Sequence, residues 1–221
     1  MNVRAVLFDL DGTLLDRMST IRRFIAAQFD RYPAFHKVDK QTFCQRFEQL
    51  DANGYVWKDT VYEQLLKEFN VTSLEVQELL DDYLDRYSEY SVPYPGMKEL
   101  LHRLGDKYKL GIITNGREAT QLPSIKSLGI ETIFEIILIS ETEGVKKPDP
   151  QIFRRAAELL DCDISECLYI GDHPFNDVEG AKQAGMKAIW KKSGDWEDCY
   201  ENDGEIDGLL DVLPILEKLV K

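Results

Sequence analysis

The chain has 221 residues, of which 43% are hydrophobic and 30% are charged, and its formal net charge is −13 at pH 7. A chain of this length can bury the core of one medium-sized domain, or of one domain that carries an insert. The excess of acidic residues creates a field that repels nucleic acid and anionic membrane surfaces, so binding to either is disfavoured.

The cysteines form neither a CxxC pair nor a cluster with histidine at zinc-binding spacing; they are Cys44, Cys162, Cys167 and Cys199. This pattern favours free thiols in a reducing compartment. Asp9 and Asp11 interrupt the first apolar run, which argues against a signal peptide. No apolar stretch has the length of a membrane span. We therefore expect a cytoplasmic protein that has no membrane partner.

The first predicted element is a short buried strand over residues 3–10, which is apolar at almost every position. Such continuous apolar character is typical of parallel strands that are covered on both faces. Asp9 and Asp11 stand at its end, and an unpaired carboxylate in an apolar core would be costly. Both residues fit if the strand ends there and the carboxylates emerge at the carboxyl edge of a sheet, where open α/β sheets bind ligands.

Residues 18–91 show helical spacing of apolar residues and indicate no strand. Four helices are predicted: one that begins near residues 19–20, one around 43–50, one over 61–69 and one over 73–87. A turn is expected at 51–54. Most of the aromatic residues in this segment should fill its own core, and Tyr55 or Trp57 is a candidate for facing a substrate.

Beyond a turn-rich link at 92–96, predicted helices and strands alternate. The helices cover 96–107, 117–128, 149–160, 176–184 and 209–220, and the strands cover 109–114, 134–139, 167–170 and 187–190. Pro123 predicts a kink or a restart in its helix, while Asp149 and Asn176 are expected to cap the helices that follow them. The acidic stretch 195–207 is expected to be a surface loop.

The alternation predicts an α/β protein with a Rossmann-like parallel sheet and right-handed crossovers. We expect a core domain formed by residues 1–16 and 93–221, and an inserted α-helical domain formed by residues 17–92.

Polar residues follow the predicted strands at the points where they end. Asp9 and Asp11 follow the first strand, the pair Thr114 and Asn115 follows the second, and Lys147 lies between the third strand and its helix. The fourth strand is followed by two further aspartates, Asp172 and Asp177. Because the carboxyl ends of parallel strands face one way, we expect these groups to converge.

The residue types favour phosphate chemistry. Neighbouring carboxylates repel one another unless a hard cation lies between them, and Mg²⁺ prefers oxygen ligands. A lysine offers a point charge to a phosphate group, and a threonine hydroxyl can donate to a phosphoryl oxygen. Asp9 is then a candidate nucleophile, because carboxylates can form aspartyl-phosphate intermediates. Asp11 is a candidate acid and base for the leaving group and the attacking water.

Four motifs occur in order: the segments 9–13 (DLDGT), 112–116 (IITNG) and 147–150 (KPDP), and Gly171-Asp172 with Asp177. Together they resemble the motifs of the haloacid dehalogenase-like (HAD) hydrolase superfamily. The resemblance implies that Asp9 attacks phosphorus. It also implies that Asp11 protonates the leaving oxygen and then activates water, and that its backbone carbonyl ligates Mg²⁺.

The resemblance assigns the remaining edge residues as well. Thr114 and Asn115 hold the phosphoryl group, and Lys147 neutralises charge on the nucleophile and the phosphate. Asp172 binds Mg²⁺, while Asp177 is either a ligand or a support for the ligands. The insert is similar to the mobile α-helical cap of one subclass, which closes to exclude water and to select the leaving group.

These assignments predict a Mg²⁺-dependent phosphatase of a small phosphorylated metabolite. A phosphomutase and, as the specific phosphatase activity, a 5′-nucleotidase remain alternatives. A non-catalytic binding protein is disfavoured because every motif residue is present, and a dehalogenase is disfavoured because that branch lacks the second aspartate, here Asp11. The predicted partner is a small phosphate ester. Both a monomer and a homodimer stay open, as does a direct role for His173.

Overall fold

The structure is a computed structural model that describes residues 3–193, 196 and 200–219. The chain divides into two compact units. The core unit comprises Met1–Asp16 and Pro93–Lys221, and the helical unit comprises Arg17–Val92. Within the described residues, no helix combines the length and the apolar character that a bilayer span requires.

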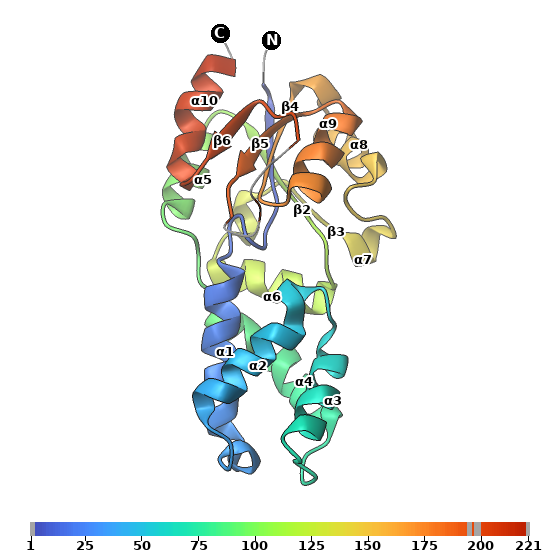
Figure 1. The fold of residues 1–221 in the computed structure, drawn as a ribbon. Coiled ribbons are helices and arrows are strands. Elements are labelled where there is room, and N and C mark those ends of the chain that lie inside the picture. The colour runs from blue at the N-terminus through green and yellow to red at the C-terminus, as the bar shows by residue number, and fades with distance from the viewer. Residues whose placement is uncertain (1–2, 194–195, 197–199, 220–221) are drawn as a thin grey trace. The chain divides into compact units, whose positions relative to one another are not determined.

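The core unit is built on a six-stranded parallel sheet in the order β3-β2-β1-β4-β5-β6 (Figure 1). The strands are β1 Ala5–Phe8, β2 Lys109–Thr114, β3 Ile136–Ile139, β4 Cys167–Gly171, β5 Lys187–Lys191 and β6 Gly204–Ile206. β1 lies between β2 and β4, and all four of its residues are buried. The predicted Rossmann-like α/β fold is therefore confirmed.

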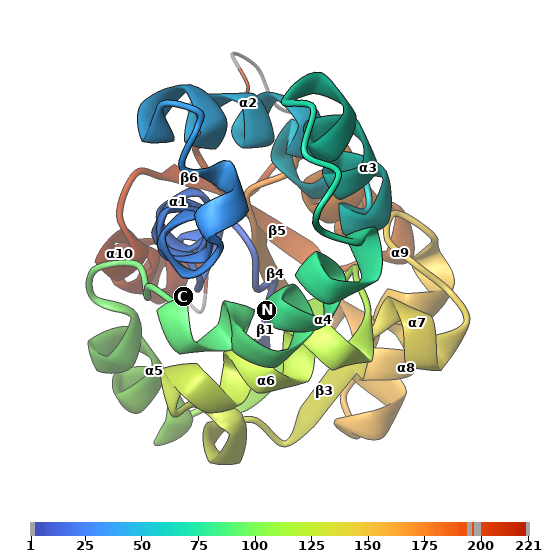
Figure 2. The same cartoon turned by 90° about the horizontal axis from the view of Figure 1, so that it is seen from below.

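Helices cover both faces of the sheet (Figure 2). One face packs against α5 (Met97–Gly105), α6 (Glu118–Leu128) and α10 (Val212–Leu219), and the other against α8 (Pro150–Leu159) and α9 (Gly180–Ala184). The short helix α7 (Ser140–Glu143) follows β3. In β1, Phe8 belongs to the first apolar cluster and Leu7 to the second. Alternate residues thus fill both layers, which explains why the strand is apolar throughout.

The prediction of a surface loop over 195–207 is wrong at its end. Residues 204–206 form the edge strand β6, which pairs with β5 and buries Ile206. Three residues with one apolar side chain carry too little pattern to be recognised as a strand. Residues 194–195 and 197–199 of this region, including Cys199, lie outside the described residues; Cys44, Cys162 and Cys167 are free thiols.

The helix α6 runs through Pro123 as one element, so it does not restart there, and a kink at this residue stays a prediction. A further local prediction in the core unit is wrong. Asn176 does not cap the helix that follows β4. Instead, His173 Nδ1 accepts hydrogen bonds from the N–H groups of Phe175 and Asn176, and it begins a π-helical turn over Pro174–Glu179 that leads into α9. The predicted cap Asp149 is confirmed, because its carboxylate accepts from the N–H of Gln151.

The helical unit contains α1 (Arg17–Arg31), α2 (Lys40–Asp51), α3 (Lys58–Glu68) and α4 (Val76–Arg86). Aromatic rings fill its core as expected; the rings of Phe35 and Phe43, for example, have centroids 4.5 Å apart. Trp57 packs edge-on against Tyr83 in this unit, whereas Tyr55 is 67% exposed.

A buried ion cluster joins α1, α2 and α3. The carboxylate of Asp51 accepts from Arg17 at 2.8 Å and from the ammonium of Lys58, and both Asp51 and Lys58 are buried. Burial alone would raise the pKa of Asp51, but the two cations lower it below its ordinary value. The carboxylate is therefore ionised and shared between two cations within the core.

We expect Asp51→Ala to destabilise the helical unit by about 3–5 kcal/mol, because two cations lose their common partner inside the protein. Native-state hydrogen exchange of the amides in α2 and α3 measures this unit separately from the sheet. The exposed ion pair between Lys40 and Asp30 supplies the control, since Lys40→Met should cost no more than about 1 kcal/mol. A similar small change for both variants would contradict the buried cluster as a stabilising feature.

Candidate active site

The carboxyl edge of the sheet places two aspartates side by side. Asp9 directly follows β1, and its N–H donates to the carbonyl of Ile170 in β4 at 2.9 Å, so the parallel pairing extends to the first candidate residue. Asp172 directly follows β4. Gly171, the last residue of β4, must be a glycine, because a Cβ at this position would collide with the side chain of Asp177.

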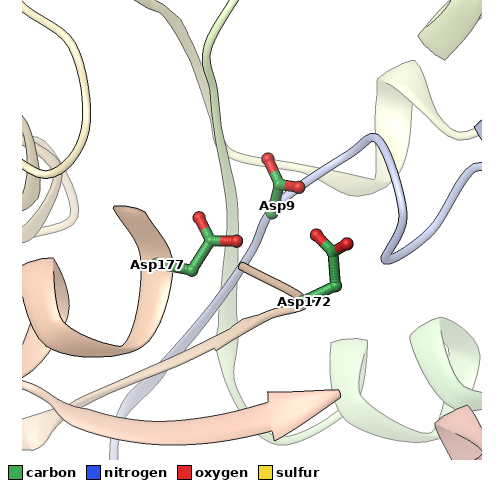
Figure 3. Close-up of side chains that lie close together, drawn as sticks. All are labelled: Asp9, Asp172 and Asp177. Carbon is green, nitrogen blue, oxygen red and sulfur yellow. The ribbon is translucent and has the colours of Figure 1, made fainter. Parts of the chain in front are cut away.

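Asp9, Asp172 and Asp177 form the acidic cluster (Figure 3). One carboxylate oxygen of each residue lies within 4.8 Å of the others. Asp9 and Asp177 are buried, and Asp172 is half-buried. Carboxylates from the end of β1, the end of β4 and the π-helical turn after β4 therefore converge at one point.

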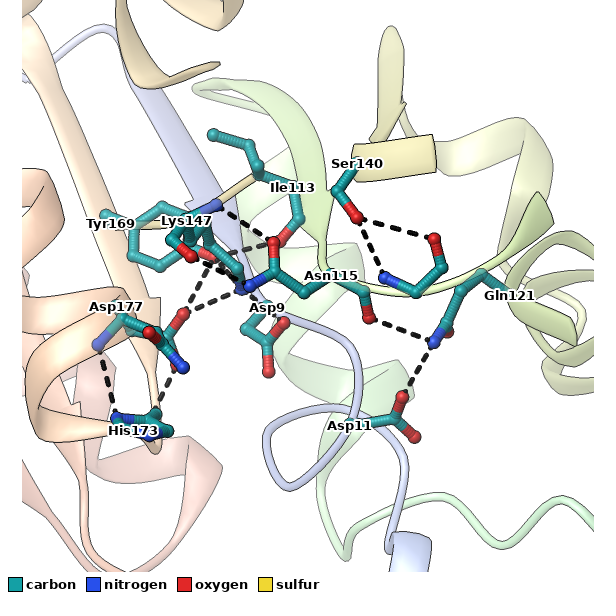
Figure 4. A network of polar contacts seen from close by, with 12 residues as sticks. Asp9, Asp11, Ile113, Asn115, Gln121, Ser140, Lys147, Tyr169, His173 and Asp177 are labelled. Carbon is teal, nitrogen blue, oxygen red and sulfur yellow. Dashed lines mark hydrogen bonds and ion pairs between the residues drawn. The ribbon is translucent and has the colours of Figure 1, made fainter. Parts of the chain in front are cut away.

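Lys147 bridges two members of the acidic cluster (Figure 4). Its ammonium lies 2.6 Å from Oδ1 of Asp9 and 2.7 Å from Oδ1 of Asp177. It also donates to the hydroxyl of Tyr169 at 2.9 Å, and that hydroxyl donates to the carbonyl of Ile113. Lys147 is only 3% exposed, whereas its neighbour Lys146 is exposed.

The acidic cluster holds more negative charge than Lys147 neutralises. Burial raises the pKa of Asp9, Lys147 opposes that shift, and the charges of Asp177 and Asp11 add to it, so that the pKa is about 7. The pKa of Asp172 is raised above its ordinary value by burial and by the charges of Asp177 and Asp9. Burial alone would lower the pKa of Lys147, but the carboxylates of Asp177 and Asp9 raise it. A further cation at this point would relieve the repulsion.

Mg²⁺ fits this environment. The cluster offers oxygen ligands only, which are the ligands that this hard cation prefers, and buried carboxylates with raised pKa values are stabilised in their ionised form by an added positive charge. Asp9, Asp172 and Asp177 are the residues that would hold the ion.

The carboxyl end of β2 supplies an unsatisfied hydroxyl. Thr114 Oγ1 is buried and makes no hydrogen bond within the described part of the chain. A buried hydroxyl in this state is a ready donor for a ligand oxygen. Thr114 therefore remains a predicted phosphate-binding residue.

Asn115 has a role that the sequence did not indicate. Its side-chain Nδ2 donates to the carbonyl of Lys147 at 3.0 Å, and its Oδ1 accepts from the N–H of Lys147 at 2.9 Å. The side chain therefore fixes the backbone that carries the buried ammonium. A contact between Asn115 and phosphate stays a prediction, and the side chain itself is committed to Lys147.

Asp11 lies outside the acidic cluster. Its carboxylate accepts a hydrogen bond at 2.9 Å from Gln121 in α6 (Figure 4). A separate position suits a residue that transfers protons to the leaving group rather than one whose side chain holds a cation. The expectation that the backbone carbonyl of Asp11 ligates Mg²⁺ stays a prediction.

Sequence reasoning also missed Lys191, at the end of β5. Its ammonium donates to the carbonyl of Gly12 at 2.8 Å and lies 3.6 Å from the ring centroid of Tyr94. Burial lowers the pKa of Lys191, and the charges of Asp172 and Asp16 oppose that shift. Only the unusual position of a lysine directly after an apolar strand could have indicated a buried role.

The parallel sheet and the acidic cluster at its carboxyl edge define a Rossmann-like α/β protein with a carboxylate site at the sheet edge. The family model described as haloacid dehalogenase-like hydrolase matches residues 6–191, and the chain belongs to this family. The family resemblance expected from the four motifs is thereby confirmed.

Three comparisons place the chain among its relatives. It is 31% identical to the glyceraldehyde 3-phosphate phosphatase of Pyrococcus abyssi, over 97% of this chain and 94% of the relative. It is also 31% identical to the pyrimidine 5′-nucleotidase YjjG of Escherichia coli, over 84% of each chain. The fold is similar to that of the HAD-hydrolase YfnB of Bacillus subtilis, solved bound to magnesium, with a TM-score of 0.79 and 23% identity over 98% of this chain and 99% of the other.

We expect Mg²⁺ to raise the melting temperature more at about pH 8 than at about pH 5. The folded-state pKa of Asp9 without metal is about 7, whereas an unfolded aspartate titrates near about 3.9. The metal-free protein therefore loses stability as the pH rises between these values, and the full penalty applies above the higher one. Bound Mg²⁺ removes that penalty, so its effect is largest where Asp9 is ionised.

Thermal unfolding with Mg²⁺ and with a chelator, at both pH values, measures this difference. Asp172→Asn should abolish most of the Mg²⁺-dependent shift, because it removes one carboxylate from the cluster. Equal shifts at the two pH values would show that Asp9 is not one of the groups that the ion stabilises.

Proposed function

We propose that the protein is a Mg²⁺-dependent phosphatase that hydrolyses a small phosphate ester through an aspartyl-phosphate intermediate on Asp9. The observation that carries this proposal is the position of Lys147, whose buried ammonium touches both Asp9 and Asp177. A nucleophilic carboxylate that must approach an anionic phosphoryl group needs such a fixed positive charge beside it. The names of the relatives, which are a phosphatase and a nucleotidase, support the same reaction class.

In the first step, a carboxylate oxygen of Asp9 attacks phosphorus while the bond from phosphorus to the ester oxygen breaks. Asp11 gives a proton to the departing oxygen, so that the product leaves as an alcohol. Lys147 and the Thr114 hydroxyl stabilise the charge on the phosphoryl oxygens. Bound Mg²⁺ would neutralise further phosphoryl charge, held by Asp9, Asp172 and Asp177.

In the second step, water replaces the aspartyl group. Asp11, now ionised, takes a proton from the attacking water, the new bond forms from water oxygen to phosphorus, and the bond from Asp9 to phosphorus breaks. Asp9 and protonated Asp11 are regenerated, and inorganic phosphate is released. We propose that the helical unit acts as the cap that shields this exchange and selects the leaving group.

The alternatives differ in what they require of the chain. A dehalogenase of this family lacks the second aspartate, and here Asp11 is present and held by Gln121. A phosphomutase would need residues that present a second hydroxyl to the phosphoryl group in place of water. A 5′-nucleotidase is the same phosphatase chemistry with a nucleoside as leaving group, and the YjjG relative makes nucleotides a sensible choice of substrate.

Turnover of p-nitrophenyl phosphate with Mg²⁺ and with a chelator tests the proposal. We expect release of phosphate that depends on Mg²⁺. A panel of phosphorylated metabolites then identifies the leaving group, beginning with glyceraldehyde 3-phosphate and pyrimidine nucleoside monophosphates, which the relatives' names indicate. Absence of metal-dependent turnover on every ester would refute the phosphatase assignment.

Asp9→Asn should abolish turnover, because an amide cannot attack phosphorus as a carboxylate does. We expect a loss of at least about 10³-fold in kcat, measured with p-nitrophenyl phosphate. Lys146→Ala is the matched control, since this exposed lysine precedes the buried one and should leave kcat unchanged. Trapping of radiolabelled phosphate on the wild-type chain, but not on the Asn variant, identifies the intermediate. Substantial turnover by the Asn variant would exclude Asp9 as the nucleophile.

A further inference from the structure

Asp11 has to present one oxygen to the leaving group, yet it lies on a loop and outside the acidic cluster. The side chain that contacts it comes from α6, 110 residues further along the chain: Gln121 Nε2 donates to Oδ2 of Asp11 at 2.9 Å. Gln121 is 7% exposed, so the amide is held within the protein and not on its surface.

The amide of Gln121 is fully oriented by a second contact. The same Nε2 donates to the carbonyl of Asn115 at 3.3 Å. A backbone carbonyl can only accept, so the nitrogen of the amide must face this side. Both amide hydrogens therefore have acceptors, and Gln121 is the donor in its hydrogen bond to Asp11.

The loop after β2 is shaped to admit Gln121. A Cβ on Gly116 would collide with the side-chain amide of Gln121, and the φ angle of Gly116 is +153°. The N–H of Gly116 donates to Oγ of Ser140 at 3.0 Å, which holds this loop in place. The glycine and the serine together keep open the path by which Gln121 reaches Asp11.

We propose that Gln121 is a positioning residue for proton transfer by Asp11. This inference rests on the proposed phosphatase function. Because Gln121 occupies Oδ2 of Asp11, the other oxygen, Oδ1, is the one that carries the proton to the leaving group and later takes a proton from water. Without Gln121 the carboxylate can rotate, and the proton is no longer aimed at the departing oxygen.

The test compares leaving groups that need a proton to different extents. Gln121→Met keeps the length of the side chain and removes the donor. We expect kcat/KM to fall about 10–100-fold for phenyl phosphate, whose leaving group is basic, and much less for p-nitrophenyl phosphate, whose leaving group departs readily without a proton. The plot of log kcat/KM against leaving-group basicity becomes steeper across a series of aryl phosphates.

Two further variants make the result specific. Gln121→Glu keeps the shape of the side chain but places an oxygen against Oδ2 of Asp11, and it should steepen the same plot. Ser124→Ala is the matched control, because Ser124 lies on the same helix, is also buried and donates to the carbonyl of Thr120. It should leave the slope unchanged. The Mg²⁺ concentration for half-maximal activity should not change in any of the three variants.

The outcomes separate the two proposals. An active wild-type enzyme whose slope is the same in the Gln121 variants would overturn the positioning role and leave the phosphatase function standing. A uniform loss on all esters would also overturn it, because that pattern reflects general damage to the site. A wild-type chain without Mg²⁺-dependent turnover on any ester would overturn both proposals.

Discussion

The buried ammonium of Lys147 between Asp9 and Asp177 is the interaction on which the rest of the site depends. A carboxylate that is buried beside two others is ionised at neutral pH only if positive charge is supplied to it. Lys147 supplies part of that charge, and it can do so only from a fixed position. Tyr169 accepts one of its hydrogen bonds, and the side chain of Asn115, directly after β2, hydrogen-bonds to both the N–H and the carbonyl of Lys147.

The loop after β1 is held as firmly as the lysine. The carbonyl of Leu10 accepts hydrogen bonds from the N–H groups of Thr13, Leu14 and Leu15, which folds the loop into a tight turn. Lys191 holds this turn through the carbonyl of Gly12, and the same ammonium lies over the ring of Tyr94. The turn and the returning chain are thus both anchored to the end of β5. A loop that carries the proposed nucleophile and the proposed proton donor only two residues apart requires this rigidity, because a misplacement of about 1 Å can cost about 10²-fold in rate.

The sequence predicted the sheet and the strand-end residues because both signals are local. An apolar run that ends in carboxylates marks a buried strand and its carboxyl edge, and the order of the motifs indicates the family. The supporting residues gave no such signal. Tyr169 sits within an apolar strand and Gln121 within an ordinary helix, so their roles depend on the pairing of β1 with β2 and β4. The edge strand β6 and the capping role of His173 were missed for a related reason, since each rests on a contact rather than on a pattern.

The charge of the chain sets a final constraint on how the site works. A net charge of −13 repels an anionic ester, and the carboxylates at the sheet edge add to this repulsion locally. Lys147 is already engaged by two carboxylates, so it cannot offset the charge of a phosphate alone. Mg²⁺ bound by the acidic cluster would therefore strengthen phosphate binding, and by linkage a bound phosphate would strengthen Mg²⁺ binding to the same degree. The two ligands would be coupled through the acidic cluster, because each would supply the charge that the other needs.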